Sequence, residues 1–520
     1  MFSKKRILIL LCVAVAVALV LVLRRTTFPP KDIVPQQDQD FCASIHVNDT
    51  AKLTNELRAI ADSMRNKTGV YVLEDGGGSL VTRAWLCEHA EKTIDIQYFI
   101  FSTDNVGLIA CDYLVRAADR GVKVRIIVDD MMVDAGIHEI LTMDSHKNIS
   151  IKIYNPGQNL GKNIFQKLGK LATHYRSFNQ RMHNKILAVD GKVVITGGRN
   201  IADEYFDYDH EYNFRDRDVL LLGKVVPQVT NSFETFWNSP IAVPVSKLIQ
   251  EKNTNFADST RFDRLHQYAC NPDNFWPQLR QEIVELPRVF HRITESGQLV
   301  WTDSVSFISD HPGKNDGRQG MRGGGITTSA LAELLKHAKH TVDIQSPYLI
   351  TTPEALELMK QAIARGVKIK ILTNSLGSTD NPEAFAGYQK NRRALLAAGV
   401  EIYEFRPDAA ERVKIATGAL QKKLNYVPVF GLHAKTMVID GNVTAIGTFN
   451  LDPRSANLNT ECFALIYSKQ IAQGVLQGMH EEYKPENSWH ISRTFNPDSK
   501  ANRIKRINTF TRKIIPRNVL

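Results

Sequence analysis

The sequence predicts an α/β fold built from two repeats, and three observations lead to this prediction. Three segments of the first half recur in the second half, in the same order and about 245 to 250 residues later. Within each half, stretches with a helical pattern alternate with short runs rich in Val and Ile, which is typical of strands between helices. The chain has 520 residues, which is too long for one simple core.

The first two recurring segments predict buried strands that follow helices. The sequence AEKTIDIQYFIF from Ala90 matches AKHTVDIQSPYLI from Ala338, and both runs are apolar enough for a buried strand. AADRGVKVRIIVDD from Ala117 matches AIARGVKIKILTNS from Ala362. In this pair a helix is expected to end at the Arg-Gly step, before a strand rich in Val and Ile.

The third recurring segment carries the same polar residues twice. HNKILAVDGKVVITGGRN from His183 matches HAKTMVIDGNVTAIGTFN from His433. Because side chains alternate along a strand, His183 and Lys185 point the same way, whereas Asp190 has the opposite parity and precedes a hairpin turn. The equivalent residues of the second copy are His433, Lys435 and Asp440. Each His-Lys pair is therefore the expected chemical pair, and each aspartate is expected to hold the local structure.

Asn200 and Asn450 continue the two motifs after turns of small residues. An amide and a Lys ammonium suit the oxygens of a phosphate group and need no metal. One H-x-K-x(4)-D motif alone could be a surface strand with a chance histidine. Two copies with the same Gly-x-x-Asn continuation, at equivalent points of a repeat, indicate a phosphate site. We expect no metal ligand and no cofactor.

The motifs resemble the paired H-x-K-x(4)-D motifs of the phospholipase D superfamily. Their flanks, RMHNKILAVDGKVVITGGRNIADEYF and HAKTMVIDGNVTAIGTFNLDPRSANLNTE, are similar to the cardiolipin synthase C branch of its bacterial members, as is NSLGSTDNPEAFAGYQKNRRALLAAGVEIYEFRPD from Asn374. The likeness extends from about residue 48 to the end. One departure is Gly447-Thr448-Phe449-Asn450, where the family often has Gly-Ser-x-Asn; threonine keeps the hydroxyl.

The resemblance implies two repeats, each a mixed β-sheet flanked by helices, packed about a pseudo-two-fold axis with one shared active site. It also implies that one histidine attacks phosphorus and the other acts as general acid and base. By analogy His183 is the nucleophile and His433 the acid and base, although two nearly symmetric halves do not order them. Lys185, Lys435, Asn200 and Asn450 would bind the phosphate.

The resemblance further pairs each histidine with a carboxylate later in the sequence. Asp216 fits this role after the first motif and Glu461 after the second, and Asp218 competes with Asp216 because it has the same strand parity. The full set of expected catalytic residues is His183, Lys185, Asp190, His433, Lys435, Asp440, Glu461 and Asp216.

The repeats and composition divide the chain into six expected parts. These are an N-terminal membrane anchor (1–25), a linker (26–47), the first repeat (48–245), a connecting region (246–300), the second repeat (301–490) and a basic tail (491–520). The apolar run Ile7–Leu23 favours an uncleaved single-pass anchor over a signal peptide. Positive charges at both of its ends leave its orientation open.

The formal net charge of +10 favours anionic partners, either phospholipid head groups or nucleic acid. The tail could lie on an anionic bilayer or could simply be solvated. Its cations are Lys500, Arg503, Lys505, Arg506, Arg512, Lys513 and Arg517.

Cysteines and glycine runs carry no predicted chemistry. The six cysteines form no C-x-x-C pair and are expected to be small core residues, not a disulfide framework. The runs Gly76–Gly78 and Gly323–Gly325 lack the Lys-Ser/Thr step of a nucleotide-binding loop and are expected to be flexible turns near the mouth of the active site.

The leading functional hypothesis is phosphatidyl transfer that makes cardiolipin at a bacterial inner membrane. The donor would be phosphatidylglycerol or phosphatidylethanolamine, and the acceptor phosphatidylglycerol. The alternative is a phospholipase D that uses water as acceptor and releases phosphatidate. A nuclease is less favoured because the sequence lacks basic and aromatic stripes, and two intact His-Lys pairs argue against an inactive lipid-binding scaffold. Oligomeric state stays open.

Overall fold

The computed structural model describes residues 42, 52–130, 137–156, 176, 179–209, 211–248, 259–275, 277–412, 428–516 and 520. The expected anchor at 1–25 and nearly all of the linker at 26–47 lie outside these residues. Among the residues described, no helix is both long enough and apolar enough to cross a membrane.

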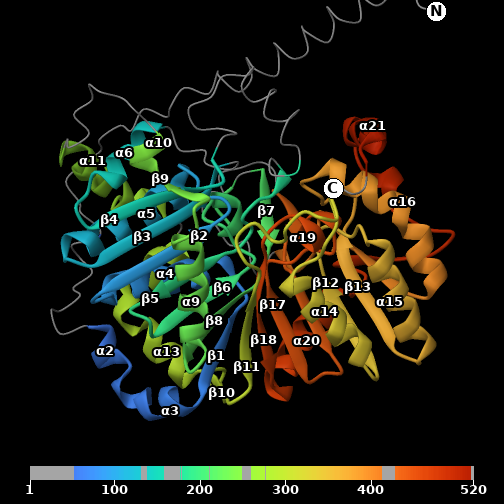
Figure 1. Ribbon diagram of the computed structural model, residues 1–520, viewed down its shortest axis with the longest axis horizontal. Helices are drawn as coiled ribbons and strands as arrows, with labels where there is room; N and C mark the ends of the chain where they lie inside the picture. Colours follow the sequence, from blue (N-terminus) through green and yellow to red (C-terminus); the bar gives the residue numbers. More distant parts are fainter. Residues whose placement is uncertain are drawn as a thin grey trace, which may run out of the picture. The chain divides into compact units, whose positions relative to one another are not determined.

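The first half forms a mixed nine-stranded sheet (Figure 1). Its strands are, in spatial order, β10 (Val300–Thr302), β1 (Thr68–Leu73), β8 (Asp218–Gly223), β6 (Val193–Gly197), β5 (Ile186–Val189), β2 (Thr93–Tyr98), β3 (Lys123–Asp129), β4 (Ile149–Tyr154) and β9 (Ala242–Pro244). The pairs β2–β3 and β3–β4 are parallel, and the other neighbours are antiparallel.

The second half repeats this arrangement in an eight-stranded sheet. Its spatial order is β11 (Val305–Ser309), β18 (Cys462–Tyr467), β17 (Val443–Gly447), β16 (Thr436–Ile439), β12 (Thr341–Gln345), β13 (Lys368–Asn374), β14 (Glu401–Phe405) and β19 (Ser488–Ile491). The parallel pairs are β12–β13 and β13–β14, at the positions of β2–β3 and β3–β4 in the first sheet. This order matches the first sheet strand for strand when the edge strand β10 is left out. The internal repeat of the sequence is therefore also a repeat of topology.

Helices follow the strands in both halves, and several of them begin at side-chain caps. In the first half these are α2 (Leu53–Glu56), α3 (Ala61–Asn66), α4 (Gly76–His89), α5 (Asn105–Asp119), α6 (Ile137–Asp144), α9 (Val226–Trp237) and α10 (Val245–Leu248). The second half has α14 (Ile326–His337), α15 (Pro353–Ala364), α16 (Pro382–Ala398), α19 (Pro453–Asn457), α20 (Lys469–Glu482) and α21 (Arg503–Thr511). Thr352 and Asn381 cap α15 and α16, and a proline follows each of these caps.

The region between the halves is helical. It contains α11 (Ser259–Ala269), α12 (Pro277–Val284) and α13 (Val289–Glu295). Helix α11 packs on α5, and α12 and α13 pack on α4. The connection therefore covers the outer helices of the first half, and the weak periodicity of its sequence reflects short helices.

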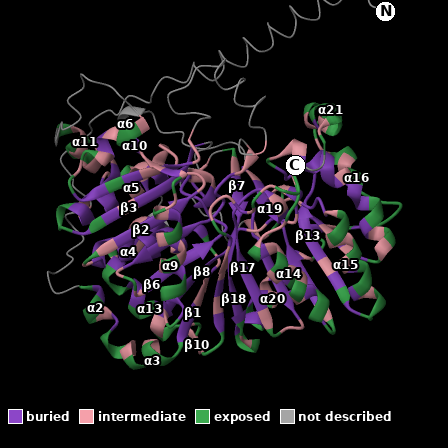
Figure 2. Ribbon diagram, viewed as in Figure 1, coloured by how far each residue is buried: buried purple, intermediate pink, exposed green. Residues whose placement is uncertain are grey.

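One apolar core lies between the two sheets, separate from the cores under the outer helices. Val194 and Leu221 of the first sheet share it with Ile446 and Ile466 of the second. Figure 2 shows the central strands of both halves buried along their length. Because apolar burial is the main favourable term in folding, this core holds the halves together as one body.

The two motif hairpins turn at Asp-Gly steps, as the sequence predicts. Asp190 and Gly191 have φ of 52° and 63°, and Asp440 and Gly441 have φ of 51° and 61°. Positive φ at both central residues matches the right-handed twist of the flanking strands. The turns therefore fix the register of β5 with β6 and of β16 with β17.

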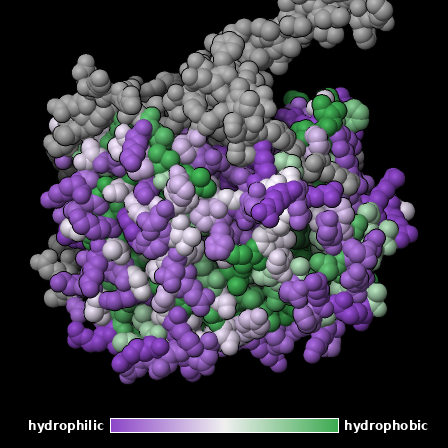
Figure 3. Space-filling model, viewed as in Figure 1, coloured by the Kyte–Doolittle hydropathy of each residue, from purple (hydrophilic) through white to green (hydrophobic). Residues whose placement is uncertain are grey.

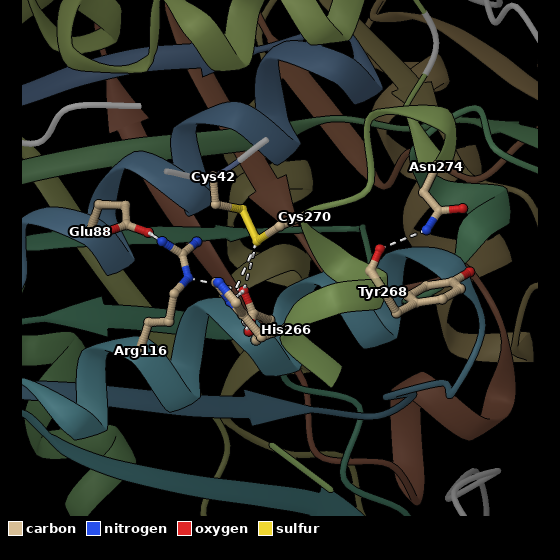
Figure 4. Close-up of a disulfide and its surroundings, with 8 residues drawn as sticks. Cys42, Glu88, Arg116, His266, Tyr268, Cys270 and Asn274 are labelled. Carbon is tan, nitrogen blue, oxygen red and sulfur yellow. Dashed lines mark hydrogen bonds and ion pairs between the residues drawn. A yellow bond between two sulfur atoms is a disulfide. The ribbon is translucent and has the colours of Figure 1, made fainter. Parts of the chain in front are cut away.

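The prediction that all cysteines are plain core residues is wrong for two of them. Cys42 and Cys270 form a disulfide across a sequence separation of 228 residues, which joins the segment before the first repeat to the end of α11 (Figure 4). Beside it, Nδ1 of His266 lies 3.0 Å from an Asp112 carboxylate oxygen. A pairing between such distant residues leaves no local spacing pattern. Cys87, Cys111 and Cys462 are free.

The glycine run at Gly76–Gly78 is also not the flexible turn that was predicted. It forms the first turn of α4, where the side chain of Asp75 accepts a hydrogen bond from the backbone N–H of Gly78. A Cβ added at Gly76 would lie 2.9 Å from the backbone of Phe206. Because glycine has no side chain, Gly76 allows the backbone of α4 to approach the backbone of Phe206 closely.

Candidate active site

The two His-Lys pairs lie in extended segments that lead into β5 and β16. Both segments lie where the two halves meet, which we call the seam. There β7 (Tyr212–Arg215) of the first half pairs in parallel with β15 (Val429–Leu432) of the second half. On the other side of the seam, Met182 forms a parallel bridge with Thr460. Main-chain contacts across the seam thus bring both motifs against the opposite half.

The first histidine is held by two consecutive residues of the second half. The backbone N–H of His183 donates to the Thr460 carbonyl at 3.0 Å, and Nδ1 of its ring lies 2.8 Å from Oε2 of Glu461. Glu461 is fully buried and its carboxylate also accepts hydrogen bonds from the hydroxyls of Thr448 and Ser455. A carboxylate held in this way accepts a hydrogen bond from Nδ1–H and leaves Nε2 as the nitrogen with the free lone pair.

The second histidine is held in the same way by the first half. The backbone N–H of His433 donates to the Arg215 carbonyl at 2.8 Å, and Nδ1 lies 2.6 Å from Oδ2 of Asp216. The Lys435 ammonium is also 2.9 Å from this Nδ1. Since one nitrogen cannot both donate to Asp216 and accept from a charged lysine, we assign its proton to the bond with the carboxylate.

The pairing of histidines and carboxylates is therefore crossed between the halves. The expectation that the carboxylate after each motif serves the histidine of that motif is wrong, because Asp216 serves His433 and Glu461 serves His183. Asp218, the competing candidate, instead pairs with Arg83 and Arg199. Asp216 and Glu461 each contact the histidine of the opposite half. The alternation of side chains along one strand cannot predict a contact between halves.

Both lysines are buried beside the histidines. Lys185 and Lys435 donate to the backbone carbonyls of His183 and His433 at 2.8 and 2.5 Å. Lys435 lowers the pKa of His183, and Lys185 lowers that of His433. Each lysine thus acts electrostatically on the histidine of the other half as well as on its own.

The two asparagines are buried but differ in their contacts. Asn200 accepts a hydrogen bond from the backbone N–H of Ile100 at 3.1 Å and also bonds the hydroxyl of Tyr205. Among the residues that the structure describes, the side-chain oxygen of Asn450 has no hydrogen-bond partner, although its backbone N–H donates to Ser455. The unpartnered atom is an acceptor, so it could accept a hydrogen bond from a ligand hydroxyl, whereas a phosphate oxygen would bind the NH2 group.

The two motif aspartates contact backbone and not the histidines. The Asp190 carboxylate accepts three backbone N–H bonds, from Glu91, Lys92 and Thr93, at 2.7 to 2.9 Å. Asp440 accepts the equivalent three from Lys339, His340 and Thr341. These bonds fix the hairpin turn to the start of β2 or β12, which is the local structural role expected from strand parity.

Burial dominates the electrostatics of the site. It lowers the pKa of His183 to about 4 and that of His433 to about 3, against the opposing effect of each carboxylate. It also lowers the pKa of Lys435 to about 7 and that of Lys185 to about 8. The pKa of Glu461 is lowered, because His183 and the two hydroxyls outweigh the effect of burial. At neutral pH both imidazoles of the free site are therefore neutral.

Comparison with known proteins assigns the family. Residues 86–237 and 331–482 each match the family described as "Cardiolipin synthase, PLD-like domain", and together they cover more than half of the chain. The chain belongs to this family. The resemblance to the phospholipase D superfamily is thereby confirmed, and so is the α/β fold with two phospholipase D-like repeats.

Individual relatives of this cardiolipin synthase family match over most of their length. Cardiolipin synthase C of Escherichia coli is 31% identical over 423 residues, which are 81% of this chain and 86% of the relative. An uncharacterized protein of Helicobacter pylori is 33% identical over 428 residues, with 82% and 81% covered. The crystal structure of phosphatidylserine synthase from Haemophilus influenzae covers 89% of this chain and all of that one, with a TM-score of 0.55 and 13% identity. At that identity the likeness shows the fold.

Several side chains that support this family's motif residues were not predicted. The hydroxyls of Thr448 and Ser455 orient Glu461. Lys314 is a buried cation that bonds Asp310, whose carboxylate accepts the backbone N–H of Glu461 at 3.0 Å. The sequence around Lys314 did not predict this role, because Asp310 and Glu461 lie near opposite ends of the second repeat.

Aromatic rings pack against both histidines. Phe99 lies edge-on to His183 with ring centroids 5.2 Å apart. Tyr205 and Phe214 lie 5.1 and 4.6 Å from His433. Packing of this kind restricts the orientations open to each imidazole.

Proposed function

We propose that this chain makes cardiolipin from two phospholipids, with phosphatidylglycerol as acceptor and phosphatidylglycerol or phosphatidylethanolamine as donor. The reaction is phosphatidyl transfer of the phospholipase D type. The observation that carries the proposal is the crossed pairing, in which each half supplies the carboxylate that orients the other half's histidine. Within the described residues, each motif histidine has its carboxylate partner in the opposite half.

In the first step, Nε2 of His183 attacks the phosphorus of the donor lipid. A nitrogen–phosphorus bond forms, and the bond from phosphorus to the head-group oxygen breaks. His433, which takes up a proton from solvent at Nε2 when the phosphodiester binds, gives that proton to the head-group oxygen, so that the head group leaves as a neutral alcohol. Its Nδ1–H stays bonded to Asp216 throughout. The product of this step is a phosphatidyl group on His183. The order of the two histidines follows the family resemblance.

In the second step, a hydroxyl of the acceptor phosphatidylglycerol attacks the same phosphorus. His433 takes the proton of this hydroxyl, the nitrogen–phosphorus bond breaks, and His183 returns to its neutral form. The bonds made and broken are those of the first step in reverse order, with a new alcohol. If water attacks instead, the product is phosphatidate.

The charges of the site suit these steps. Neutral His183 is the form that can attack phosphorus, and its low pKa keeps it neutral at pH 7. A bound phosphodiester carries one negative charge, which raises the pKa of His433 toward the range needed by a general acid. In this proposal Lys185, Lys435, Asn200 and Asn450 stabilise negative charge on the phosphoryl oxygens, the lysines through their ammonium groups and the asparagines through their NH2 groups.

We place the enzyme at a bacterial inner membrane, held by the apolar segment Ile7–Leu23. The disulfide between Cys42 and Cys270 supports a position of the catalytic part on the oxidising side of that membrane, since disulfides are rare in a reducing cytoplasm.

The direct test is to incubate purified protein with labelled phosphatidylglycerol, with and without phosphatidylethanolamine, and to separate the lipid products. Cardiolipin is the expected product, and its dependence on phosphatidylethanolamine identifies the donor. Phosphatidate alone would show that water is the acceptor and would reject the transferase. Cleavage of nucleic acid without lipid turnover would reject both lipid reactions, and no turnover at all would indicate an inactive scaffold.

A further inference from the structure

Helix α21 near the C-terminus carries an apolar stripe that faces solvent. Ile504, Ile507 and Phe510 recur every three residues and are 73%, 62% and 71% exposed. Ile514, in the following turn η8 (Arg512–Ile514), is 89% exposed. Figure 2 shows α21 mostly exposed, and Figure 3 shows apolar atoms at the same place. Other exposed large apolar residues of the described chain, such as Val284 and Tyr467, stand singly.

The side of α21 that faces the protein is polar. Thr509 is buried, and the Lys505 ammonium donates to the carbonyl of Gly377 at 2.9 Å. Arg512, on the same side, forms an ion pair with Glu383 of α16. In a surface helix the apolar stripe ordinarily faces the core. Here the arrangement is reversed, which is the pattern of a helix that buries its apolar side in something outside the protein.

Cations flank the exposed stripe. Arg503, Arg506 and Lys513 are exposed, and within the described part of the chain none of them takes part in an ion pair. With Ile507 and Phe510 they line a hollow of about 510 Å³ between α21 and α16. The one acidic residue in this hollow, Asp498, is already paired with Arg392. The surface therefore combines apolar side chains with uncompensated positive charge.

This surface adjoins the proposed active site. The segment 375–380 lies between them, because Lys505 binds Gly377 and the exposed carboxylate of Asp380 accepts a hydrogen bond from Tyr348 at 2.7 Å. The Ser378 carbonyl of this segment accepts a hydrogen bond from the hydroxyl of Tyr212. The Tyr212 ring packs on Phe214, which packs on His433. A lipid head group bound beside α21 would thus lie next to a segment that contacts the surroundings of the second histidine.

We propose that α21 and η8 dock the catalytic part on an anionic bilayer. Ile504, Ile507, Phe510 and Ile514 enter the head-group region, and Arg503, Arg506 and Lys513 bind lipid phosphates, as an interfacial amphipathic helix does. Such docking would bring the active site to the lipid surface, independently of the N-terminal segment. The inference deepens the proposed function and rests on it for the link to turnover, but not for the docking itself.

A local probe tests the docking in the full chain. Binding to vesicles as such is not informative, because the N-terminal apolar segment would also hold the protein there. Phe510→Trp adds one tryptophan to the five of the chain, and subtraction of the wild-type signal isolates its emission. The vesicles contain phosphatidylglycerol and phosphatidylcholine brominated on its acyl chains. The matched control is Tyr467→Trp, at an exposed apolar residue outside α21.

We expect the tryptophan at position 510 to be quenched at least about twofold by the brominated lipid, and the quenching to weaken at high salt. The tryptophan at position 467 is expected to be unaffected. Equal quenching at the two positions would overturn the proposal. So would a blue-shifted emission at 510 without quenching, which would mean that protein, for example a second copy of the chain, covers the stripe.

Kinetics separate docking from catalysis. Replacing Ile504, Ile507 and Phe510 together by serine removes exposed side chains only and should leave folding intact. We expect the apparent KM for phosphatidylglycerol in vesicles to rise roughly tenfold, with turnover of dispersed short-chain phosphatidylglycerol unchanged. An unchanged KM for vesicles would overturn the proposal, as would an equal loss on both substrates. If the wild type turns over neither substrate, the proposed function fails while the quenching result still decides the docking.

Discussion

A histidine that reacts with phosphorus needs one ring nitrogen free and the other held. Both histidines of this chain meet that condition, since Nδ1 of each lies within 2.8 Å of a buried carboxylate oxygen. The carboxylates differ in their own support. Glu461 accepts two hydroxyl bonds, whereas Asp216 accepts the backbone N–H of Arg217. At the position of Thr448 the first half has Gly198, where an added Cβ would lie 2.0 Å from Asp216.

Replacing either carboxylate by its amide should impair turnover without unfolding the protein. In Glu461→Gln and Asp216→Asn the shape is kept, but the anion that fixes the imidazole tautomer is lost. We expect kcat to fall by roughly 10² to 10⁴ in each variant. The matched control is Thr448→Val, which removes one hydroxyl bond to Glu461 and should cost about tenfold. The measurement is turnover on phosphatidylglycerol together with the melting temperature. Near-normal kcat in both amide variants would contradict the assigned roles.

The pH dependence of kcat/KM should be bell-shaped. As pH falls toward 4, His183 gains a proton and can no longer attack phosphorus. As pH rises through about 7 to 8, Lys435 and then Lys185 lose the charge that binds the phosphate. Activity is thus lost on the acid side by protonation and on the alkaline side by deprotonation. Because kcat/KM reports groups of the free enzyme, a profile that stays flat from pH 5 to 9 would contradict these assignments.

At the scale of elements, the motif hairpins are fixed by their aspartates. Each carboxylate ties a turn to the start of the neighbouring strand, and each aspartate has a positive φ that alanine adopts only with strain. Asp190→Ala and Asp440→Ala should each lower the free energy of unfolding by about 3 kcal/mol, measured by urea denaturation. Asparagine adopts the positive φ of this turn more readily than alanine, so Asp190→Asn should lower the free energy of unfolding by less.

Activity distinguishes this structural role from a chemical one. The folded fraction of Asp190→Ala should lose far less kcat than Glu461→Gln does. If instead Asp190→Ala were fully stable but as inactive as the amide variants, the aspartate would have a direct part in catalysis.

The elements were largely predictable, because their signals are local. The runs from Ala90 and Ala338 form β2 and β12, and the Arg-Gly steps at 120–121 and 365–366 end α5 and α15. The Asp-Gly turns were predictable for the same reason. Gly76–Gly78 was misread, because Asp75 was not recognised as a cap. Predictions failed where a contact depends on how the halves associate, as with the crossed carboxylates, and no periodicity within one repeat reports that.

At the scale of the whole molecule, an apolar core and a disulfide hold together parts that are distant in the sequence. The core between the sheets joins the halves, and the disulfide joins residue 42 to the connecting region. Reduction of the disulfide should lower the free energy of unfolding by roughly 2 to 4 kcal/mol, seen as a lower melting temperature in reductant.

The control for this prediction is the double variant Cys42→Ser/Cys270→Ser. It should melt at the temperature of the reduced wild type and should not respond to reductant. If reductant lowered the melting temperature of the double variant as much as that of the wild type, its effect would have to come from elsewhere in the chain.

The central claim is that two imidazoles, one from each half, act on a single phosphorus atom. Its most direct measurement is mass spectrometry of the protein quenched in alkali after incubation with phosphatidyl-p-nitrophenol, whose leaving group needs no acid. In His433→Ala, the account predicts a phosphatidyl group that accumulates on the peptide containing His183, because the acceptor can no longer be deprotonated. In His183→Ala the adduct should be absent. An adduct on any other residue, or one that persists when His183 is replaced, would contradict the account.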